Sequence, residues 1–421
     1  MHIYKRFLII VPLLLLIVAS LQAQNIATEL YPPSYIKTVK LQGTGEFTGA
    51  PFFKLGEPLT LTFDDINGNE EDYYYKISYY NFDWTPSQLY QNEFMEGFDD
   101  VRIVTYENSF NTYQLYSNYR LKIPNEDTKR LKVSGNYMLE IYDDQDKLIF
   151  TRKFILYEDM ATIGVTIKRS RDLNFIDTKQ VVQFEINSAE EILKNPKRTV
   201  RTLVLQNNNL KTAITDLIPQ FTIGNSLVYK YDQEASFWGG NEFLFFDNKE
   251  VRTATANIES IDLQDIYHNY LFTDIVRANR PYTYNPDING SFVVRNLRAD
   301  DNSTQADYVW MHFSLECFAP IGNGELHVFG NFNNFILDES TKLHFDKNTA
   351  RFDTKILFKQ GFYNYRYVLL KEDGTLDPGF ISGNFDETEN EYTVLAYYRA
   401  PAARYDRVIG KGNGNSLNIR N

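Results

Sequence analysis

The segment Tyr73–Thr112, which reads YYYKISYYNFDWTPSQLYQNEFMEGFDDVRIVTYENSFNT, decides how the rest of the chain is interpreted. At its start the odd positions from Tyr73 to Tyr79 are all large and apolar, whereas Lys76 and Ser78 lie between them. A period of two is typical of a half-buried β-strand. The number of large rings in this short stretch indicates that it supplies much of the core of a first domain.

The same segment predicts a change of direction after this strand. The apolar phase slips near Tyr80–Asn81, which we interpret as a β-bulge that inserts one unpaired residue. Thr85 and Pro86 then form a helix-start pattern, with Thr85 as the N-cap residue. We expect a short helix over Ser87–Met95, and we expect Gly97 to end it.

The composition favours an all-β protein of several domains. The chain has 421 residues, of which 43% are hydrophobic and 15% are aromatic, so large cores are available. The net charge of −12 argues against binding to nucleic acid and against direct insertion into an anionic membrane. Cys317 is the single cysteine, so no disulfide within the chain is expected.

The first 23 residues have the pattern of a secretory signal peptide. Lys5 and Arg6 form the basic region, Phe7–Val18 is apolar, and small residues lead up to Ala23. No cysteine stands directly after the apolar region, which argues against a lipid anchor. We therefore expect removal of residues 1–23 and a periplasmic location.

The strand pattern predicts three consecutive immunoglobulin-like or early-set β-sandwiches. We place the first at residues 24–158, the second at 159–305 and the third at 306–403. Residues 404–421 contain GKGNGN and few apolar side chains, so we expect a disordered tail. The strands expected in the first sandwich are Ile36–Gln42, Leu59–Phe63, Tyr73–Tyr80, Val101–Tyr106, Asn111–Ile123, Asn136–Tyr142 and Leu148–Tyr157.

Residues that carry catalytic or metal chemistry are sparse. His312 and His327 could face each other on neighbouring strands, but exposed sheet histidines explain them better than a metal site. Cys317 lies on the apolar face of the predicted strand Val309–Cys317, so we expect it in a core. Adjacent carboxylates are interpreted as turn residues rather than as a catalytic pair; they occur at Asp64–Asp65, Asp99–Asp100, Asp143–Asp146 and Asp300–Asp301. We expect no enzyme activity, no cofactor and no metal.

Two aromatic features could instead contact a partner protein. The segment Phe237–Phe243 places Trp238 beside two glycines, either at a hairpin tip packed on its own core or as an exposed anchor. Trp84 is open to the same two interpretations. The candidate contact residues are Trp84, Tyr90, Phe94, Trp238 and Phe243.

The third predicted sandwich resembles the early-set domain of glycogen-binding modules. The resemblance lies in Leu326–Phe335, Phe352–Phe358 and Gly361–Tyr367. Those modules usually have tryptophan where Phe335 stands, so a structural role is favoured over sugar stacking. A periplasmic or surface glycan-binding protein remains the alternative function.

Taken as a whole, the chain resembles the type IX secretion system plug proteins of the Bacteroidota. The matching residues are Asn81–Leu89, Glu93–Phe94, Gly97–Phe98, Ser109–Thr112, Tyr116–Tyr119, Pro124, Phe237–Phe246 and Asp307–Leu315. One departure is visible, since a His–Cys pair is expected near Asn81–Phe82.

The resemblance implies a periplasmic protein on the inner side of the outer membrane. Its partner would be the outer-membrane type IX translocon barrel, of the SprA-like kind, with no nucleic acid and no small-molecule substrate. The protein would close the periplasm-facing opening of that barrel while no cargo partner is engaged.

Overall fold

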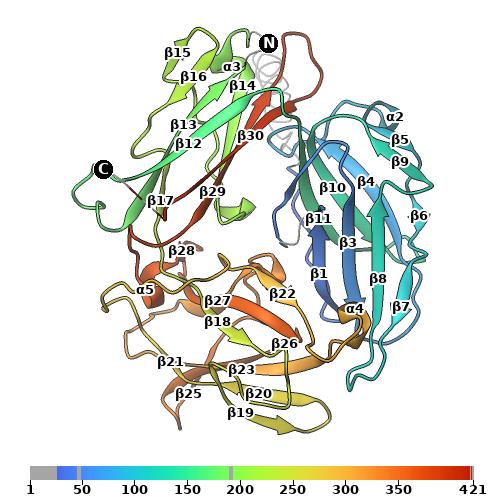
Figure 1. Cartoon of the computed structure of the whole chain (residues 1–421), viewed down its shortest axis with the longest axis vertical. Helices are drawn as coiled ribbons and strands as arrows, with labels where there is room; N and C mark the ends of the chain where they lie inside the picture. The colour runs from blue at the N-terminus through green and yellow to red at the C-terminus, as the bar shows by residue number, and fades with distance from the viewer. Residues whose placement is uncertain (1–25, 45–48, 189–192, 418, 420–421) are drawn as a thin grey trace, which may run out of the picture.

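A computed structural model of the chain describes residues 26–44, 49–188, 193–417 and 419. The predicted signal peptide lies outside the described residues. The fold is all-β, as predicted, and forms three β-sandwiches (Figure 1). None of the helices in the described part of the chain is long and apolar enough to cross a membrane.

The first sandwich packs a sheet of order β1-β3-β8-β7 against a sheet of order β2-β11-β10-β4-β6, with a β5-β9 ribbon beside them. Its core contains the predicted tyrosines, because Tyr73, Tyr75 and Tyr79 are all buried. Edge-on packing of Phe63 of one sheet against Phe150 of the other, with ring centroids 5.3 Å apart, joins the two sheets into one core. The strands are β1 Ile36–Gln42, β2 Phe52–Lys54, β3 Leu59–Asp65, β4 Tyr74–Tyr80, β5 Met95–Gly97, β6 Val101–Arg102, β7 Tyr106–Asn108, β8 Ser117–Ile123, β9 Thr128–Leu131, β10 Gly135–Tyr142 and β11 Leu148–Tyr157.

The second sandwich is built from two separate parts of the chain. Strands of residues 162–238 form the sheet β12-β13-β16-β15, with β17 paired to β13. The opposite sheet has the order β14-β29-β30, so β14 pairs with a strand almost two hundred residues later. The strands are β12 Thr162–Arg169, β13 Lys179–Asn187, β14 Val200–Gln206, β15 Phe221–Ile223, β16 Ser226–Tyr229, β17 Ser236–Trp238, β29 Glu391–Tyr398 and β30 Arg407–Asn415.

The third sandwich is inserted into the second, between β17 and β29, and we call it the inserted sandwich. In Figure 1 it occupies the lower part of the molecule. Its sheets have the orders β18-β27-β22, with β24 and β28 on β27, and β19-β20-β23-β26-β25, with β21 on β23. The strands are β18 Leu244–Asp247, β19 Ile258–Leu263, β20 Tyr267–Leu271, β21 Asp274–Ile275, β22 Phe292–Val294, β23 Tyr308–Glu316, β24 Glu325–Phe329, β25 His344–Asp346, β26 Arg351–Lys359, β27 Gly361–Leu370 and β28 Leu376–Asp377.

The predicted order of three consecutive sandwiches is therefore wrong. The boundary expected near residue 305 falls inside the inserted sandwich, whose buried core runs from Phe246 to Ile381. Local strand patterns do not reveal which distant strands pair, so they could not predict that one sandwich is inserted into another. The segment at this expected boundary contains a short helix, α4. The helices are α2 Gln91–Phe94, α3 Pro196–Thr199, α4 Asn302–Gln305 and α5 Gly379–Ser382, with single 3₁₀ turns at Leu210–Thr212 and Asn331–Asn333.

The prediction of a disordered tail is also wrong, because β30 belongs to the second sandwich. Ile409 is almost completely buried in its core. A Cβ atom on Gly410 or Gly412 would lie 2.5 Å from a carbonyl oxygen of the neighbouring segment, at Ala161 and Ile163 respectively. The glycines thus permit two backbone segments to pack closely. From composition alone, the same glycines resembled a disordered tail.

The turn after β4 differs from the predicted bulge and helix. Asn81 N–H donates to the Thr85 carbonyl at 2.9 Å, which closes a tight turn. Pro86 then forms a bridge with Tyr80 rather than starting a helix. Only Gln91–Phe94 is helical, because the residues just after the turn run back antiparallel to the end of β4.

Replacement of Ile409 by alanine tests whether β30 holds the second sandwich together. Removing a buried isoleucine leaves a cavity and costs about 2–5 kcal/mol of stability. We expect that loss for Ile409→Ala in urea unfolding, and almost none for Leu417→Ala, because Leu417 is exposed just after the strand. Equal stability of the two variants would contradict the assignment of β30 to the core.

Candidate partner-contact surface and the seams between sandwiches

Two of the predicted contact aromatics are exposed to solvent. The Tyr90 side chain is 75% exposed beside α2, and Trp238 is 40% exposed on the last residue of β17. The Trp238 ring packs edge-on against Phe175, with centroids 5.7 Å apart, and Lys179 Nζ lies 4.5 Å from its centroid. With these neighbours in place, Trp238 remains partly open to solvent.

Two others are buried, so their prediction as contact residues is wrong. Phe94 is 6% exposed and stacks on Tyr79 in the core of the first sandwich, at 5.6 Å between centroids. Phe243 is 5% exposed, and the Arg366 guanidinium lies 4.9 Å from its ring centroid. Phe94 is the last residue of the short helix α2, and Phe243 lies just before β18. At such positions the sequence has no period that separates inward-facing from outward-facing side chains.

Trp84 is half-buried and lies at a seam between the first and second sandwiches. It packs with Phe82 against a small cluster of buried residues that includes Leu203 and Tyr397. The Lys153 ammonium lies 4.2 Å from the Trp84 ring centroid. Trp84 therefore serves mainly as an internal contact, with limited area left for a partner.

The sequence interpretation missed a group of exposed apolar side chains on the first sandwich. Tyr90 and Phe98 flank α2 and β5, whereas the loop after β7 lies at the opposite end, beside α4 (Figure 1). The sequence signal for these residues was their position in irregular segments, because an apolar residue outside a strand is not part of an alternating pattern that points it into the core. The missed residues are Phe98, Val104, Phe110, Tyr113 and Leu115.

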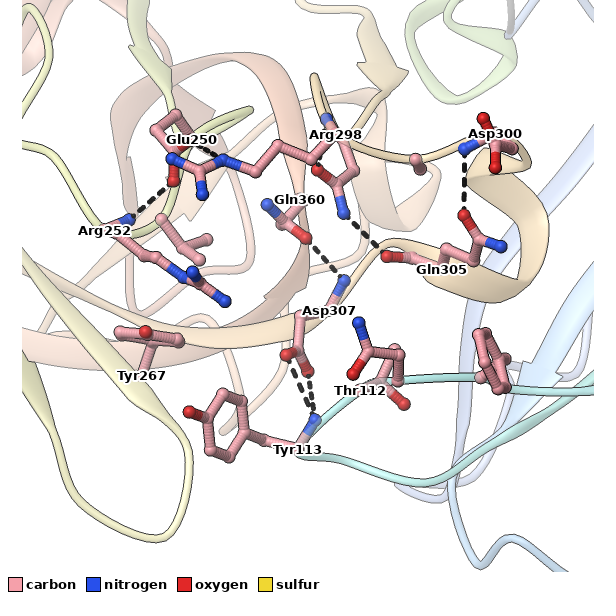
Figure 2. A pocket seen from close by; sticks show the side chains of 15 residues that line it. Thr112, Tyr113, Glu250, Arg252, Tyr267, Arg298, Asp300, Gln305, Asp307 and Gln360 are labelled. Atoms are coloured by element: carbon pink, nitrogen blue, oxygen red, sulfur yellow. Dashed lines mark hydrogen bonds and ion pairs between the residues drawn. The ribbon is translucent and has the colours of Figure 1, made fainter.

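A cleft of about 460 Å³ lies where this loop meets the inserted sandwich. Figure 2 shows the Asp307 carboxylate facing the backbone of Tyr113, whose N–H it accepts at 3.1 Å, while Gln360 Oε1 accepts the Asp307 N–H at 2.7 Å. The Tyr113 ring also meets Tyr267 edge-on, with centroids 5.3 Å apart. The cleft is therefore part of a seam that fixes the loop.

The polar groups of this cleft are engaged with one another rather than aimed at a substrate. Glu250 accepts hydrogen bonds from Arg298 Nε at 2.6 Å and from the Arg252 backbone at 3.1 Å (Figure 2). No group of three or more His, Cys, Asp or Glu side chains that could hold a metal ion occurs within the described ranges of the chain. The arrangement supports adhesion between domains and offers no activated nucleophile.

His312 and His327 lie in different sheets, and the prediction that they are exposed sheet histidines is wrong, because His312 is half-buried and His327 is buried. His312 Nε2 instead lies 2.8 Å from His268 Nδ1 on the neighbouring strand. Burial, then the charges of His268 and Lys355, lower the pKa of His312 to about 4, so its ring is neutral at pH 7. His327 is buried and hydrogen-bonds to Thr341 at 3.1 Å. Cys317 is buried, as predicted.

The strongest polar contact between sandwiches involves a carboxylate that we predicted to lie in a turn. Asp64 lies within β3 and is fully buried. Its Oδ2 accepts hydrogen bonds from Lys359 Nζ at 2.7 Å and from the Tyr308 hydroxyl at 2.6 Å, and its Oδ1 accepts one from Asn118 at 2.7 Å. Lys359 is 2% exposed and also donates to the Ser303 carbonyl at 2.7 Å. A buried ion pair thus joins the first sandwich to the inserted one.

Comparison with known proteins places the first sandwich in a family. A family model described as the type 9 secretion system plug protein 1st domain matches residues 36–158, which span β1 to β11. The chain belongs to the type 9 secretion system plug protein family. This confirms the resemblance that the sequence suggested.

One solved structure matches nearly the whole chain. A crystal structure of a hypothetical protein from Parabacteroides merdae ATCC 43184 is 33% identical, with a TM-score of 0.87, and the match covers 92% of this chain and 98% of that one. The collagen adhesin of S. aureus, at 10% identity and a TM-score of 0.12 over 90% and 92% of the two chains, carries no structural argument. No curated protein matches the sequence.

In this plug-family protein, the segment Phe237–Phe243 is a crossing between sandwiches rather than a hairpin tip. The chain leaves β17 there, and the Thr388 hydroxyl of the returning segment donates to the Gly240 carbonyl at 2.8 Å. At the end of the crossing, Asp287 accepts the backbone N–H groups of Phe243 and Asn289. Burial chiefly raises the pKa of Asp287 to about 7, while those two hydrogen bonds oppose the shift.

Removal of either member of the Asp64–Lys359 pair should be strongly destabilising. The remaining buried charge would be uncompensated, which costs about 3–5 kcal/mol. We expect that loss for Asp64→Asn and for Lys359→Met in urea unfolding, and a loss below the sum in the double variant. Lys54→Met is the control, because its ion pair with Asp159 is exposed and should matter little. Additive single losses would contradict a direct pairing.

The raised pKa of Asp287 predicts a pH dependence of stability. The folded state keeps this proton up to about pH 7, whereas an unfolded aspartate releases it near pH 4. The free energy of unfolding should therefore fall as the pH rises through this window and then level off. We expect a smaller fall between pH 5 and 8 for Asp287→Asn than for the wild type, and an unchanged fall for the exposed Asp144→Asn.

Proposed function

We propose that this protein closes the periplasm-facing opening of the outer-membrane type IX translocon barrel while no cargo partner is engaged. The observation that carries the proposal is the match of β1–β11 to the plug family's first domain. The N-terminal signal pattern supports export to the periplasm.

The architecture is suited to a removable stopper. A barrel wide enough for folded cargo would leak solutes, so its closure requires a folded body larger than the opening. Buried contacts between the three sandwiches, such as the Asp64–Lys359 pair, hold such a body in one shape. Release requires that the contact with the barrel be weaker than these internal seams, and a contact made by a few exposed aromatics would meet that condition.

The alternative of glycan binding finds no support at Phe335, where glycogen-binding modules usually have tryptophan. Phe335 is buried and packs on Phe329, with ring centroids 5.0 Å apart, so it offers no platform for a sugar. Trp84 lines a cavity between the first and second sandwiches, which Trp238 does not line. The two tryptophans therefore do not form one sugar-sized groove.

Capture of the barrel by tagged variants of this chain tests the proposal. Loss of an aromatic anchor costs about 2 kcal/mol or more, which is more than tenfold in affinity. We expect Tyr90→Ala and Trp238→Ala to reduce recovery of the barrel from detergent-solubilised envelopes without lowering the melting temperature appreciably. Phe318→Ala is the matched control, because Phe318 is an exposed aromatic on the inserted sandwich. Wild-type protein that recovers no large outer-membrane barrel would refute the proposal.

A further inference from the structure

The outer face of the β1-β3-β8-β7 sheet meets the inserted sandwich around Asp64, while Arg120 and Lys122 on the same face stay exposed. In β3 the core positions Leu59, Leu61 and Phe63 are buried, and the alternate residues point to the other face. Asp64 is one of these alternate residues, and it reaches Lys359 of the inserted sandwich. The two sandwiches therefore face each other across this surface.

The strand register places two basic side chains and a hydroxyl in one row of that surface. Lys40 of β1 is paired with Thr62 of β3, and Thr62 is paired in turn with Arg120 of β8. All three line a cavity of about 410 Å³, which Ser303 and Lys359 close from the inserted sandwich. The cavity is thus built jointly by the two domains.

The charges around this cavity do not balance. Lys359 is compensated by Asp64, but neither Lys40 nor Arg120 has a side-chain hydrogen bond or ion pair with any residue that the structure describes. None of the described residues lining the cavity is acidic. The neighbouring Asp301 carboxylate accepts hydrogen bonds from the hydroxyls of Ser303 and Thr304 and keeps its negative charge, so it offsets part of the positive charge of Arg120.

Two further observations agree with an anion-binding site. The Thr62 hydroxyl is buried and has no hydrogen-bond partner within the described part of the chain. Burial and then the charge of Lys359 lower the pKa of Lys40 to about 8; Asp64 opposes the shift and Arg120 adds to it. An anion between Lys40 and Arg120 would offset this repulsion.

We propose that this cavity binds a compact oxyanion, in the form of a phosphate, sulfate or carboxylate group. Lys40 and Arg120 would donate charge-assisted hydrogen bonds from opposite sides, and the Thr62 hydroxyl would donate a third from between them. Because the cavity wall comes from two sandwiches, the bound anion would also strengthen their contact. This site is independent of the proposed plugging of the barrel.

Titration of the full mature chain with inorganic phosphate tests the site. Binding is monitored by ³¹P NMR and by calorimetry, and a titration with sodium chloride at equal ionic strength is the control. We expect saturable binding of phosphate and a higher melting temperature. Loss of one charge-assisted hydrogen bond weakens affinity about tenfold or more, so Lys40→Met and Arg120→Gln should each show that loss. Lys122→Met is the matched control, since Lys122 is exposed on the same strand and face as Arg120 but does not line the cavity.

Two additions keep the test decisive. Thr62→Val preserves the size and charge of the site, so it reports on the hydroxyl even if a charge variant fails to fold, and we expect weaker binding. Competition by sulfate alone would assign the site to tetrahedral oxyanions, and competition by acetate as well would extend it to carboxylates. Phosphate binding that is absent, that does not exceed the effect of chloride, or that is unchanged in folded Lys40→Met and Thr62→Val would overturn the proposal.

Discussion

The arrangement of the three sandwiches depends on the burial of the Asp64 carboxylate against the Lys359 ammonium. Both groups leave water completely, which is costly unless each finds its partner in good geometry. The Tyr308 hydroxyl and Asn118 amide satisfy the remaining lone pairs of the carboxylate. Any sliding of the inserted sandwich over the first would separate these charges in a dry environment, so the pair specifies one relative position.

The seam between the first and second sandwiches uses neutral and apolar contacts in addition to charge. The Tyr397 hydroxyl donates to Asn136 Oδ1 at 2.7 Å, and Phe82 packs edge-on against the Tyr397 ring. Arg399 binds Asp406 and also donates to Asn81 Oδ1 at 2.7 Å, which ties the turn after β4 to the end of the chain. With two covalent crossings between the second and inserted sandwiches, every pair of sandwiches is joined. A body joined in this way resists deformation when pressed against an opening.

How far the sequence predicts this structure depends on whether the signal is local. The inward face of β23 follows from a period of two, because half-buried strands require it. The bounds of β1 and β11 also agree with the sequence prediction. The insertion of one sandwich into another depends on pairing between β14 and β29, which no local pattern encodes. The glycines of β30 looked like disorder because their purpose, close backbone approach, appears only when the neighbouring segment is in place.

The partner-contact surface was predicted less well than the fold for a related reason. Tyr90 and Trp238 are exposed, but Phe94 and Phe243 are buried, and aromatic character alone does not separate these cases. The buried Asp64 was mistaken for a turn residue because its partner lies almost three hundred residues away. The family resemblance of the first sandwich, by contrast, rests on a contiguous motif and was confirmed.

The most direct measurement of the central claim is the ionic conductance of the purified translocon barrel in a planar bilayer, before and after this protein is added to the periplasmic side. The account predicts a large open-pore conductance that drops nearly to baseline with saturable dependence on the added chain. Addition to the opposite side should leave the pore open. An unchanged conductance at saturating protein, with the barrel and the chain both folded, would contradict the account.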